Sequence, residues 1–263
     1  MTIFRADLLK GKRILVTGGG TGLGREIAGE YAKLGAEVYI CGRRGAVVAE
    51  TARELAETHN TRVTPIECDI RSPDAVENMM TRVFNEGPLT GLVNNAAGNF
   101  ISRTKDLSPN GFNAIANIVF HGTFYVTLAA GKRWIEARQQ ANVVSILTTS
   151  VWNGGPFTVP SAMSKAGINV MTRSLAVEWA PHLFATRGCV THKALVSPHL
   201  VVRRELRDYP SNTTRPKGRS SIKWRRASVA SSSLYARSTT GFTLPEVSSG
   251  RMAAHAAAFV ACD

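Results

Sequence analysis

The stretch TGGGTGLG, from Thr17 to Gly24, decides the fold of this chain. Before it lies RILVT, residues 13–17, a short apolar run typical of a buried strand, and after it the chain has helical periodicity to about residue 35. Its glycines allow a tight turn and leave backbone N–H groups at the start of a helix free to bind an anion. The stretch therefore predicts a dinucleotide pyrophosphate at this turn; the alternative is an ordinary glycine-rich turn.

The same alternation of strand and helix continues along the first two thirds of the chain. Short β-branched runs alternate with amphipathic segments, which predicts β-α-β units and a parallel sheet. Strands are expected at 13–17, 36–41, 62–68, 89–95 and 142–147, and helices at 22–35, 46–58, from Ser72 onward, 111–137 and 161–179. The fold class is therefore α/β, a doubly wound parallel Rossmann sheet, and residues 1–182 form its dinucleotide-binding domain.

The end of the second expected strand indicates which dinucleotide binds. Where an acidic residue would hold the ribose of NADH, the chain has Cys41-Gly42-Arg43-Arg44. Both arginines supply guanidinium groups suited to a 2′-phosphate, because arginine binds phosphate through paired hydrogen bonds. The sequence favours NADPH as the cofactor; the alternative is a pair of solvated arginines at a helix start.

Two further segments carry a family resemblance. CDI, residues 68–70, and NNAAGNF, residues 94–100, follow the third and fourth expected strands, and together with TGGGTGLG they resemble the short-chain dehydrogenases/reductases. The resemblance covers residues 9–182. It implies that the cofactor is bound by Gly18, Thr21, Gly22, Leu23, Gly24, Arg43, Arg44, Asp69, Ile70, Asn95, Ala96 and Lys165.

The catalytic set of that family is altered in this chain. Most members reduce carbonyls with a tyrosine as proton donor and a lysine four residues later; here Lys165 is kept, but Ser161 stands in the tyrosine position. Thr148 stands where the family has its serine. Because a serine hydroxyl has a far higher pKa than a phenol, it is a poor general acid at neutral pH, and a standard ketone reductase is disfavoured.

NNAAGNFIS, SAMSKAG and SLAVEWAP resemble one branch of the family, the 2,4-dienoyl-CoA reductases. That resemblance implies that Asn99 polarises a thioester carbonyl and that Lys165 binds the nicotinamide ribose. Members of the mitochondrial type have a tyrosine fifteen residues before the lysine, where this chain has Ser150, so a hydroxyl of Ser150 or Ser161 relays a proton from water, or the chain belongs to a divergent enoyl reductase group.

The same branch implies three substrate contacts. Phe100 and Ser108 fall where the branch lines its acyl-CoA pocket, and Arg71 lies near where it contacts the CoA moiety. Their alternative interpretations are an apolar packing residue, a helix N-cap before Pro109 and a surface arginine, respectively.

The expected function is NADPH-dependent reduction of an unsaturated acyl-CoA in fatty acid degradation, by a homotetramer formed through the helices at 111–137 and 161–179. One alternative is a 3-oxoacyl or other carbonyl reductase of the same superfamily. Another is a non-catalytic protein that binds a dinucleotide or a nucleic acid through a basic tail.

That tail holds most of the charge. The chain of 263 residues has a net charge of +13, and residues 183–263 contribute +9 of it. This segment lacks sustained periodicity, and we expect an atypical region in place of the family's last strands. A shifted reading frame beginning between Pro181 and Ala185 explains its content; a genuine basic appendage that binds nucleic acid is the alternative. We expect an uncovered sheet edge at the fifth strand and a poorly folded or inactive chain.

The remaining composition indicates a cytoplasmic protein. The four cysteines are far apart, so neither a disulfide framework nor a metal site is expected. The N-terminus has no apolar core typical of a signal peptide, and no stretch is expected to span a membrane.

Overall fold

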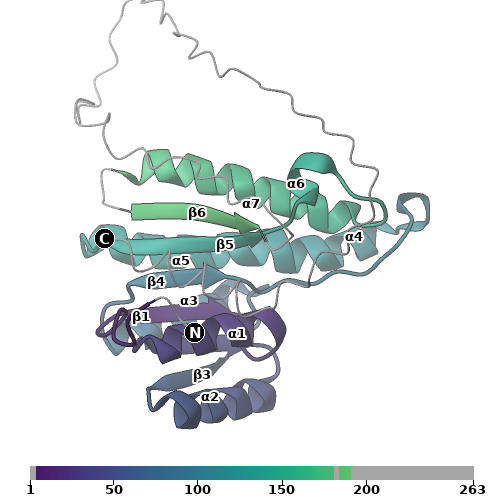
Figure 1. Ribbon diagram of the computed structural model, residues 1–263. Coiled ribbons are helices and arrows are strands. Elements are labelled where there is room, and N and C mark those ends of the chain that lie inside the picture. The colour runs from purple at the N-terminus through teal and green to yellow at the C-terminus, as the bar shows by residue number, and fades with distance from the viewer. Residues whose placement is uncertain (1–3, 181–183, 191–263) are drawn as a thin grey trace, which may run out of the picture. The chain divides into compact units, whose positions relative to one another are not determined.

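The computed structural model describes residues 4–180 and 184–190, all of which lie in one compact unit. Its centre is a parallel six-stranded sheet in the order β3-β2-β1-β4-β5-β6 (Figure 1). The strands are β1 (Arg13–Thr17), β2 (Glu37–Gly42), β3 (Val63–Glu67), β4 (Gly91–Asn94), β5 (Ala141–Leu147) and β6 (Phe184–Val190). The predicted doubly wound Rossmann sheet is confirmed. Strand order reverses between β1 and β4, and such a reversal leaves a crevice at the carboxyl ends of these strands.

Helices cover both faces of the sheet, as the sequence predicts. They are α1 (Gly22–Lys33), α2 (Gly45–His59), α3 (Pro73–Asn85), α4 (Pro109–Ala116), α5 (Thr123–Glu136), α6 (Ser150–Asn153) and α7 (Val159–Glu178). Ile27, Tyr31 and Leu34 bury the apolar face of α1 with side chains of β1, β2 and α2. Side chains of α3 and α5 form a second core on the opposite face of the sheet. These two cores hold the strand ends rigidly in place.

Local capping agrees with the sequence at two helix starts. The Ser72 hydroxyl accepts a hydrogen bond from the Ala75 N–H at the start of α3, at 3.3 Å. Ser108 does the same for Gly111 at the start of α4, at 3.0 Å. Each cap satisfies a helix N–H that would otherwise lack a partner, so these serines determine where the helices begin.

The long helical run from Pro109 to Glu136 is rich in apolar residues. It is continuous through a π-helical turn at Asn117–Gly122, and its length and mean hydropathy (1.3) would alone suffice to cross a membrane. In the fold, 56% of its most apolar window is buried within the protein. Trp134, for example, is fully buried and donates its indole N–H to the Leu89 carbonyl oxygen at 2.6 Å. Core packing therefore explains its apolar composition.

The sheet also continues past residue 182, where regular structure was expected to stop. β6 pairs in parallel with β5 over seven residue pairs, from Ala141 opposite Phe184 to Leu147 opposite Val190. The expected uncovered edge at β5 is therefore wrong. Parallel pairing relies on main-chain hydrogen bonds, so this strand forms without a clear hydrophobic alternation. The rest of the atypical region, residues 191–263, and the question of a shifted reading frame there, lie outside the described residues.

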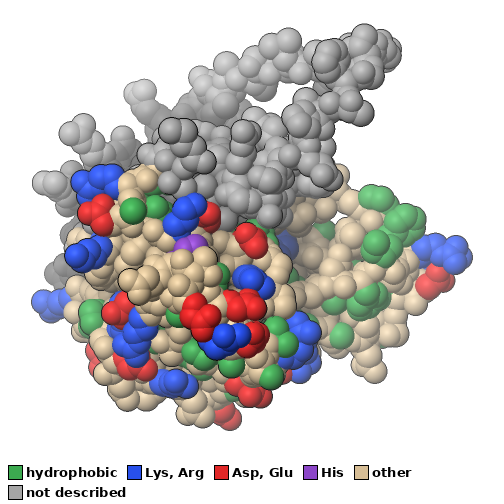
Figure 2. Space-filling view, turned by 60° about the horizontal axis from the view of Figure 1, so that its bottom comes forward, with side chains coloured by type: hydrophobic (Ala, Val, Ile, Leu, Met, Phe, Trp, Pro, Cys, Tyr) green, Lys and Arg blue, Asp and Glu red, His purple; other side chains and the backbone are tan. Residues whose placement is uncertain are grey.

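The surface around α2 is a mixture of charges (Figure 2). Arg53 pairs with Glu50 and Glu57 on α2 itself, and Arg25 of α1 pairs with Glu54 at 2.8 Å. These exposed pairs contribute little to stability individually, but they leave this face without a strong field of one sign.

Candidate active site

A cavity of about 550 Å³ opens at the carboxyl ends of β1 to β4, where the strand order reverses. It is lined by Gly18, Thr21, Leu23, Gly24, Cys41, Arg43, Arg44, Cys68, Asp69, Ile70, Asn95, Ala96, Ala97 and Ile118. The structure thus brings together nearly all of the residues expected to bind a dinucleotide. Of that set, Gly22 and Lys165 do not line the cavity.

The glycines form a cradle that fits a dinucleotide. A Cβ atom on Gly24 would lie 2.2 Å from the Gly18 carbonyl oxygen and 2.4 Å from Asn95 Nδ2. Gly18 itself has a φ of +67°, and its Cβ would lie 2.9 Å from the Ala96 Cα. Gly22 also has a positive φ, +54°. Because side chains are excluded here, the backbone at the start of α1 can approach a pyrophosphate closely.

Thr17 joins the glycine turn to the segment that follows β4. Its buried hydroxyl donates to the Val93 carbonyl oxygen at 3.3 Å and accepts from the N–H groups of Asn95 and Ala96, both at 3.0 Å. The Asn95 side chain in turn donates to the Thr17 and Gly18 carbonyl oxygens, at 2.9 and 3.4 Å. These bonds hold two walls of the cavity at a set distance.

Replacing Thr17 with valine keeps the shape of the side chain but removes the three hydrogen bonds of its hydroxyl. We expect the free energy of unfolding to fall by about 1–3 kcal/mol, because the Ala96 N–H loses this acceptor and the Asn95 N–H keeps only its bond to the Val93 carbonyl oxygen among the bonds described. Urea unfolding of the full chain measures this change. Thr58→Val is the matched control, since its exposed hydroxyl donates to the Glu54 carbonyl oxygen within α2. An equal loss in both variants would contradict the role of Thr17.

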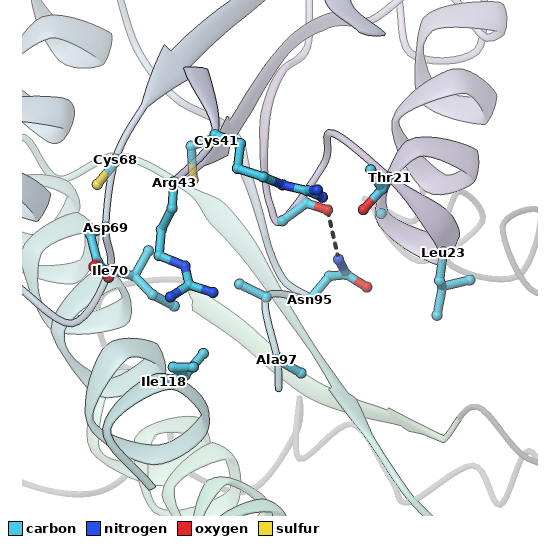
Figure 3. A pocket seen from close by; sticks show the side chains of 14 residues that line it. Thr21, Leu23, Cys41, Arg43, Cys68, Asp69, Ile70, Asn95, Ala97 and Ile118 are labelled. Atoms are coloured by element: carbon cyan, nitrogen blue, oxygen red, sulfur yellow. Dashed lines mark hydrogen bonds between the residues drawn. The ribbon is translucent and has the colours of Figure 1, made fainter. Parts of the chain in front are cut away.

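Arg43 supplies positive charge to the cavity. Figure 3 shows its side chain reaching inward from the end of β2, with Asp69 and Ile70 on one side and Asn95 and Ala97 on the other. Arg44, the next residue, also lines the cavity, and both arginines are exposed. The residues directly after β2 include no carboxylate that would repel a phosphate bound by these arginines.

The one acidic side chain among the lining residues is already paired. The Arg71 guanidinium donates to both oxygens of Asp69, with Nε at 3.0 and 2.9 Å, and this bonding holds the pKa of Asp69 below its usual value. Arg71 itself is exposed and does not line the cavity. The structure therefore agrees with its alternative interpretation as a surface arginine, and a contact with CoA stays a prediction.

Sequence reasoning missed four lining residues: Cys41, Cys68, Ala97 and Ile118. Burial raises the pKa of Cys41 and raises that of Cys68 to about 11, so both thiols are neutral at physiological pH. The cysteines and Ala97 lie close in sequence to residues that were predicted to bind the cofactor, and this closeness could have identified them. Ile118 comes from the π-helical turn and has no such signal.

Lys165 lies inside the protein, away from the cavity wall. It is on α7, buried, and donates a hydrogen bond to the Ile146 carbonyl oxygen of β5. Burial lowers its pKa to about 8. A lysine with such a pKa loses its proton easily, so its environment suits a role in proton transfer or in binding a neutral hydroxyl.

The three hydroxyl candidates lie near the end of β5 and on α7, and all are half-buried. Thr148 follows β5, Ser150 begins α6, and Ser161 precedes Lys165 by one turn of α7. A Cβ on Gly155 would lie 2.9 Å from the Ser150 Oγ. Their roles stay predictions.

Two of the three substrate candidates, Phe100 and Ser108, lie with Asn99 on the loop between β4 and α4. Asn99 and Phe100 are exposed, and Phe100 and Ser108 meet at Gly111, whose Cβ would lie 3.3 Å from each. Ser108 is the N-cap described above, which confirms its alternative interpretation. The Ser102 N–H donates to the Phe157 carbonyl oxygen at 3.1 Å and so joins this loop to the one after α6.

Among the residues described, no group of three or more His, Cys, Asp or Glu side chains is placed to hold a metal ion.

The family model for short chain dehydrogenases matches residues 12–191 of this chain. The chain belongs to the short-chain dehydrogenase family. The resemblance expected over residues 9–182 is confirmed, and the match extends through β6. A solved short-chain dehydrogenase-type fold, the citronellol catabolism dehydrogenase of Pseudomonas aeruginosa, is 32% identical with a TM-score of 0.67, covering 71% of this chain and 76% of that one.

Named relatives of this short-chain dehydrogenase point to one branch. A Caenorhabditis elegans protein named "Probable 2,4-dienoyl-CoA reductase 3" is 46% identical over 183 residues, which cover 68% of this chain and 59% of that protein. A Bacillus subtilis protein named "Probable 2,4-dienoyl-CoA reductase" is 39% identical over 169 residues, covering 64% and 66%. The predicted likeness to this branch is confirmed. The chain spans about three fifths of the length of the C. elegans relative.

Proposed function

We propose that this short-chain dehydrogenase binds NADPH and reduces an unsaturated acyl-CoA in fatty acid degradation. The observation that carries the proposal is Ser161, which stands one turn before the buried Lys165 in the place of a phenol donor. Such a site is poorly suited to protonating a ketone oxygen, and the relatives named as 2,4-dienoyl-CoA reductases support the alternative chemistry.

The cavity supports the choice of cofactor. Gly18 and Gly24 leave room for the pyrophosphate, while Arg43 and Arg44 place two guanidinium groups where a 2′-phosphate would meet the end of β2. Asp69, the acidic side chain among the lining residues, is already paired with Arg71. When bound, the nicotinamide supplies the hydride.

Residues outside the lining of the cavity would then stabilise the developing charge and transfer the proton. Asn99 would donate its amide N–H to the thioester oxygen, where negative charge accumulates during reduction. Lys165 would bind a ribose hydroxyl. The hydroxyl of Ser150 or Ser161 would relay a proton from water to the substrate carbon. Asn99 belongs to an exposed loop, so it can reach a substrate that enters from solvent.

Exposed apolar side chains on the joined loops support an acyl substrate. Phe100, Ile101, Trp152 and Phe157 are all exposed, although large apolar residues are usually buried. The hydrogen bond from Ser102 holds the two loops together, and Phe157 keeps a left-handed backbone with φ of +64°. A chain of methylene groups would cover these surfaces.

We propose that the chain forms a homotetramer, because further apolar side chains are exposed on its helices. Along α7, Met163, Val170 and Val177 recur every seven residues and are exposed, and Phe120 and Phe124 are exposed on the neighbouring helical run. An apolar stripe of this period suits a partner helix.

We also propose a cytoplasmic location, supported by Cys41 and Cys68, which are free thiols.

Replacing Asn99 with alanine tests the proposed reaction. We expect turnover of a 2,4-dienoyl-CoA with NADPH to fall by about 100-fold or more, because the oxygen loses its donor, while NADPH binding is unchanged. NADPH oxidation at 340 nm and a fluorescence titration measure the two. Asn110→Ala, an exposed residue of α4, is the matched control.

A second substrate separates the proposal from a carbonyl reductase. The wild-type chain should oxidise NADPH with the dienoyl-CoA and not with acetoacetyl-CoA. Faster turnover of acetoacetyl-CoA, or full activity in the Asn99 variant, would contradict the proposed reaction.

A further inference from the structure

A carboxylate lies against the residue that follows the arginine pair of the cavity. Glu67 is the last residue of β3, and Gly45 is the first residue of α2, immediately after Arg44. A Cβ atom on Gly45 would lie 2.2 Å from Glu67 Oε2 and 3.0 Å from its Cδ. The Glu67 carboxylate therefore rests against the backbone of Gly45, in space that a Cβ atom at this position would occupy.

Sheet pairing places Glu67 there. In the parallel register of β2 with β3, Gly42 stands opposite Glu67, so the carboxylate lies one strand away from the point where Arg43 and Arg44 leave the sheet. Cys68 and Asp69, which follow Glu67, line the cavity itself. Glu67 is thus adjacent to the cavity in two ways: it directly precedes lining residues at the end of β3, and it contacts the first residue of α2.

The charge of Glu67 is not neutralised by a close partner. Within the part of the chain that the structure describes, no Lys, Arg or His nitrogen lies within 4.0 Å of its carboxylate, and the residue is exposed. The acidic residues of α2 differ, because Glu50 and Glu57 pair with Arg53 and Glu54 pairs with Arg25. Glu67 therefore carries a negative charge without an ion-pair partner among the described residues, against the backbone of Gly45.

We infer that Glu67 is a specificity-determining residue that restrains the preference for a 2′-phosphorylated cofactor. This inference rests on the proposed use of NADPH, because it assumes that a 2′-phosphate approaches Arg43 and Arg44. A phosphate there bears up to two negative charges and is repelled by the carboxylate, whereas the 2′-hydroxyl of NADH is not. Glu67 thereby narrows the difference in affinity between the two cofactors without contacting the nicotinamide.

Replacing Glu67 with glutamine tests this role through binding alone. Calorimetric titration of the full-length chain with adenosine 2′,5′-bisphosphate and with AMP compares ligands that differ at the 2′-phosphate. In Glu67→Gln we expect the bisphosphate to bind about 3- to 10-fold more tightly, as expected for one charge removed at close range in a partly solvated site, with AMP unchanged. The gain should shrink at about 1 M salt, because salt screens exposed charges.

Two further variants test whether the change in affinity depends on the position of the Glu67 carboxylate. Glu57→Gln removes the same charge at the other end of α2, about 18 Å along the helix, and should leave the ratio of the two affinities unchanged. Gly45→Ala keeps the charge but displaces the carboxylate, and should give part of the gain. A thermal melt of each variant confirms that it is folded.

An unchanged ratio in Glu67→Gln, or an equal change in Glu57→Gln, would overturn the inference. The proposed cofactor fails by a different result, namely a wild-type chain that binds the bisphosphate no more tightly than AMP. Because the inference concerns the change between variants and the proposed function concerns the wild type, the two failures are distinguishable.

Discussion

Replacing Gly24 with alanine should abolish dinucleotide binding. The new Cβ would lie 2.2 Å from the Gly18 carbonyl oxygen and 2.8 Å from its carbonyl carbon, and this is backbone that cannot rotate away like a side chain. Either the start of α1 or the glycine turn must move, and both present the N–H groups that would hold the pyrophosphate. We expect NADPH affinity to fall by at least about 100-fold, a loss equivalent to about 3 kcal/mol.

The matched control is Gly29→Ala on the same helix. A Cβ there would meet only side chains, with the Leu55 Cδ2 at 3.3 Å, so the helix can accept it. Fluorescence titration with NADPH, alongside a thermal melt, should show normal binding by this control. A folded Gly24→Ala protein that binds NADPH as tightly as wild type would contradict the placement of the pyrophosphate.

Replacing Lys165 with methionine should stabilise the protein in neutral solution and remove the ribose-binding role proposed for this lysine. Burial lowers the pKa of Lys165 to about 8 from a value of 10.5 in the absence of the fold, so the folded state disfavours the charge. Below pH 8 the lysine is protonated in both the folded and unfolded states, and its burial then costs about 3 kcal/mol. Methionine avoids this cost but loses the hydrogen bond to Ile146, so we expect a net gain of about 2 kcal/mol at pH 7.

The gain should depend on pH with a defined sign. Between pH 8 and 10.5 the unfolded wild type binds more protons than the folded one, so wild-type stability rises relative to the variant across this window. Urea unfolding of both proteins at several pH values measures the difference between their free energies of unfolding. Cys41 and Cys68 have an opposing pH dependence, but they contribute equally to both proteins, so their effect cancels in this difference.

Lys10→Met, at an exposed position, should show no such trend. A constant difference between wild type and Lys165→Met from pH 7 to 10.5 would contradict the lowered pKa. Loss of turnover in the stabilised variant would illustrate that a functional residue can be kept at the expense of stability.

The order of elements was predictable because each follows from a local pattern. RILVT and the other apolar runs have the length and composition of buried strands, and Ser72 and Ser108 mark helix starts by capping. β6 was not predictable in the same way, because its pairing with β5 depends on the edge that β5 offers and not on its own periodicity. What covers the apolar helical run from Pro109 to Glu136 was likewise decided by the tertiary structure, since composition does not show how a helix packs.

By itself, the sequence determined the family, the glycine cradle and the arginines at the end of β2. These features depend on residue types at short spacing, where the backbone geometry follows directly from the local sequence. Only the tertiary structure decided that Ile118 lines the cavity, that Lys165 is buried against Ile146, and that Glu67 rests on Gly45. These relations join residues from different strands and helices, and their distances and their effects on charge exist only once the sheet has assembled.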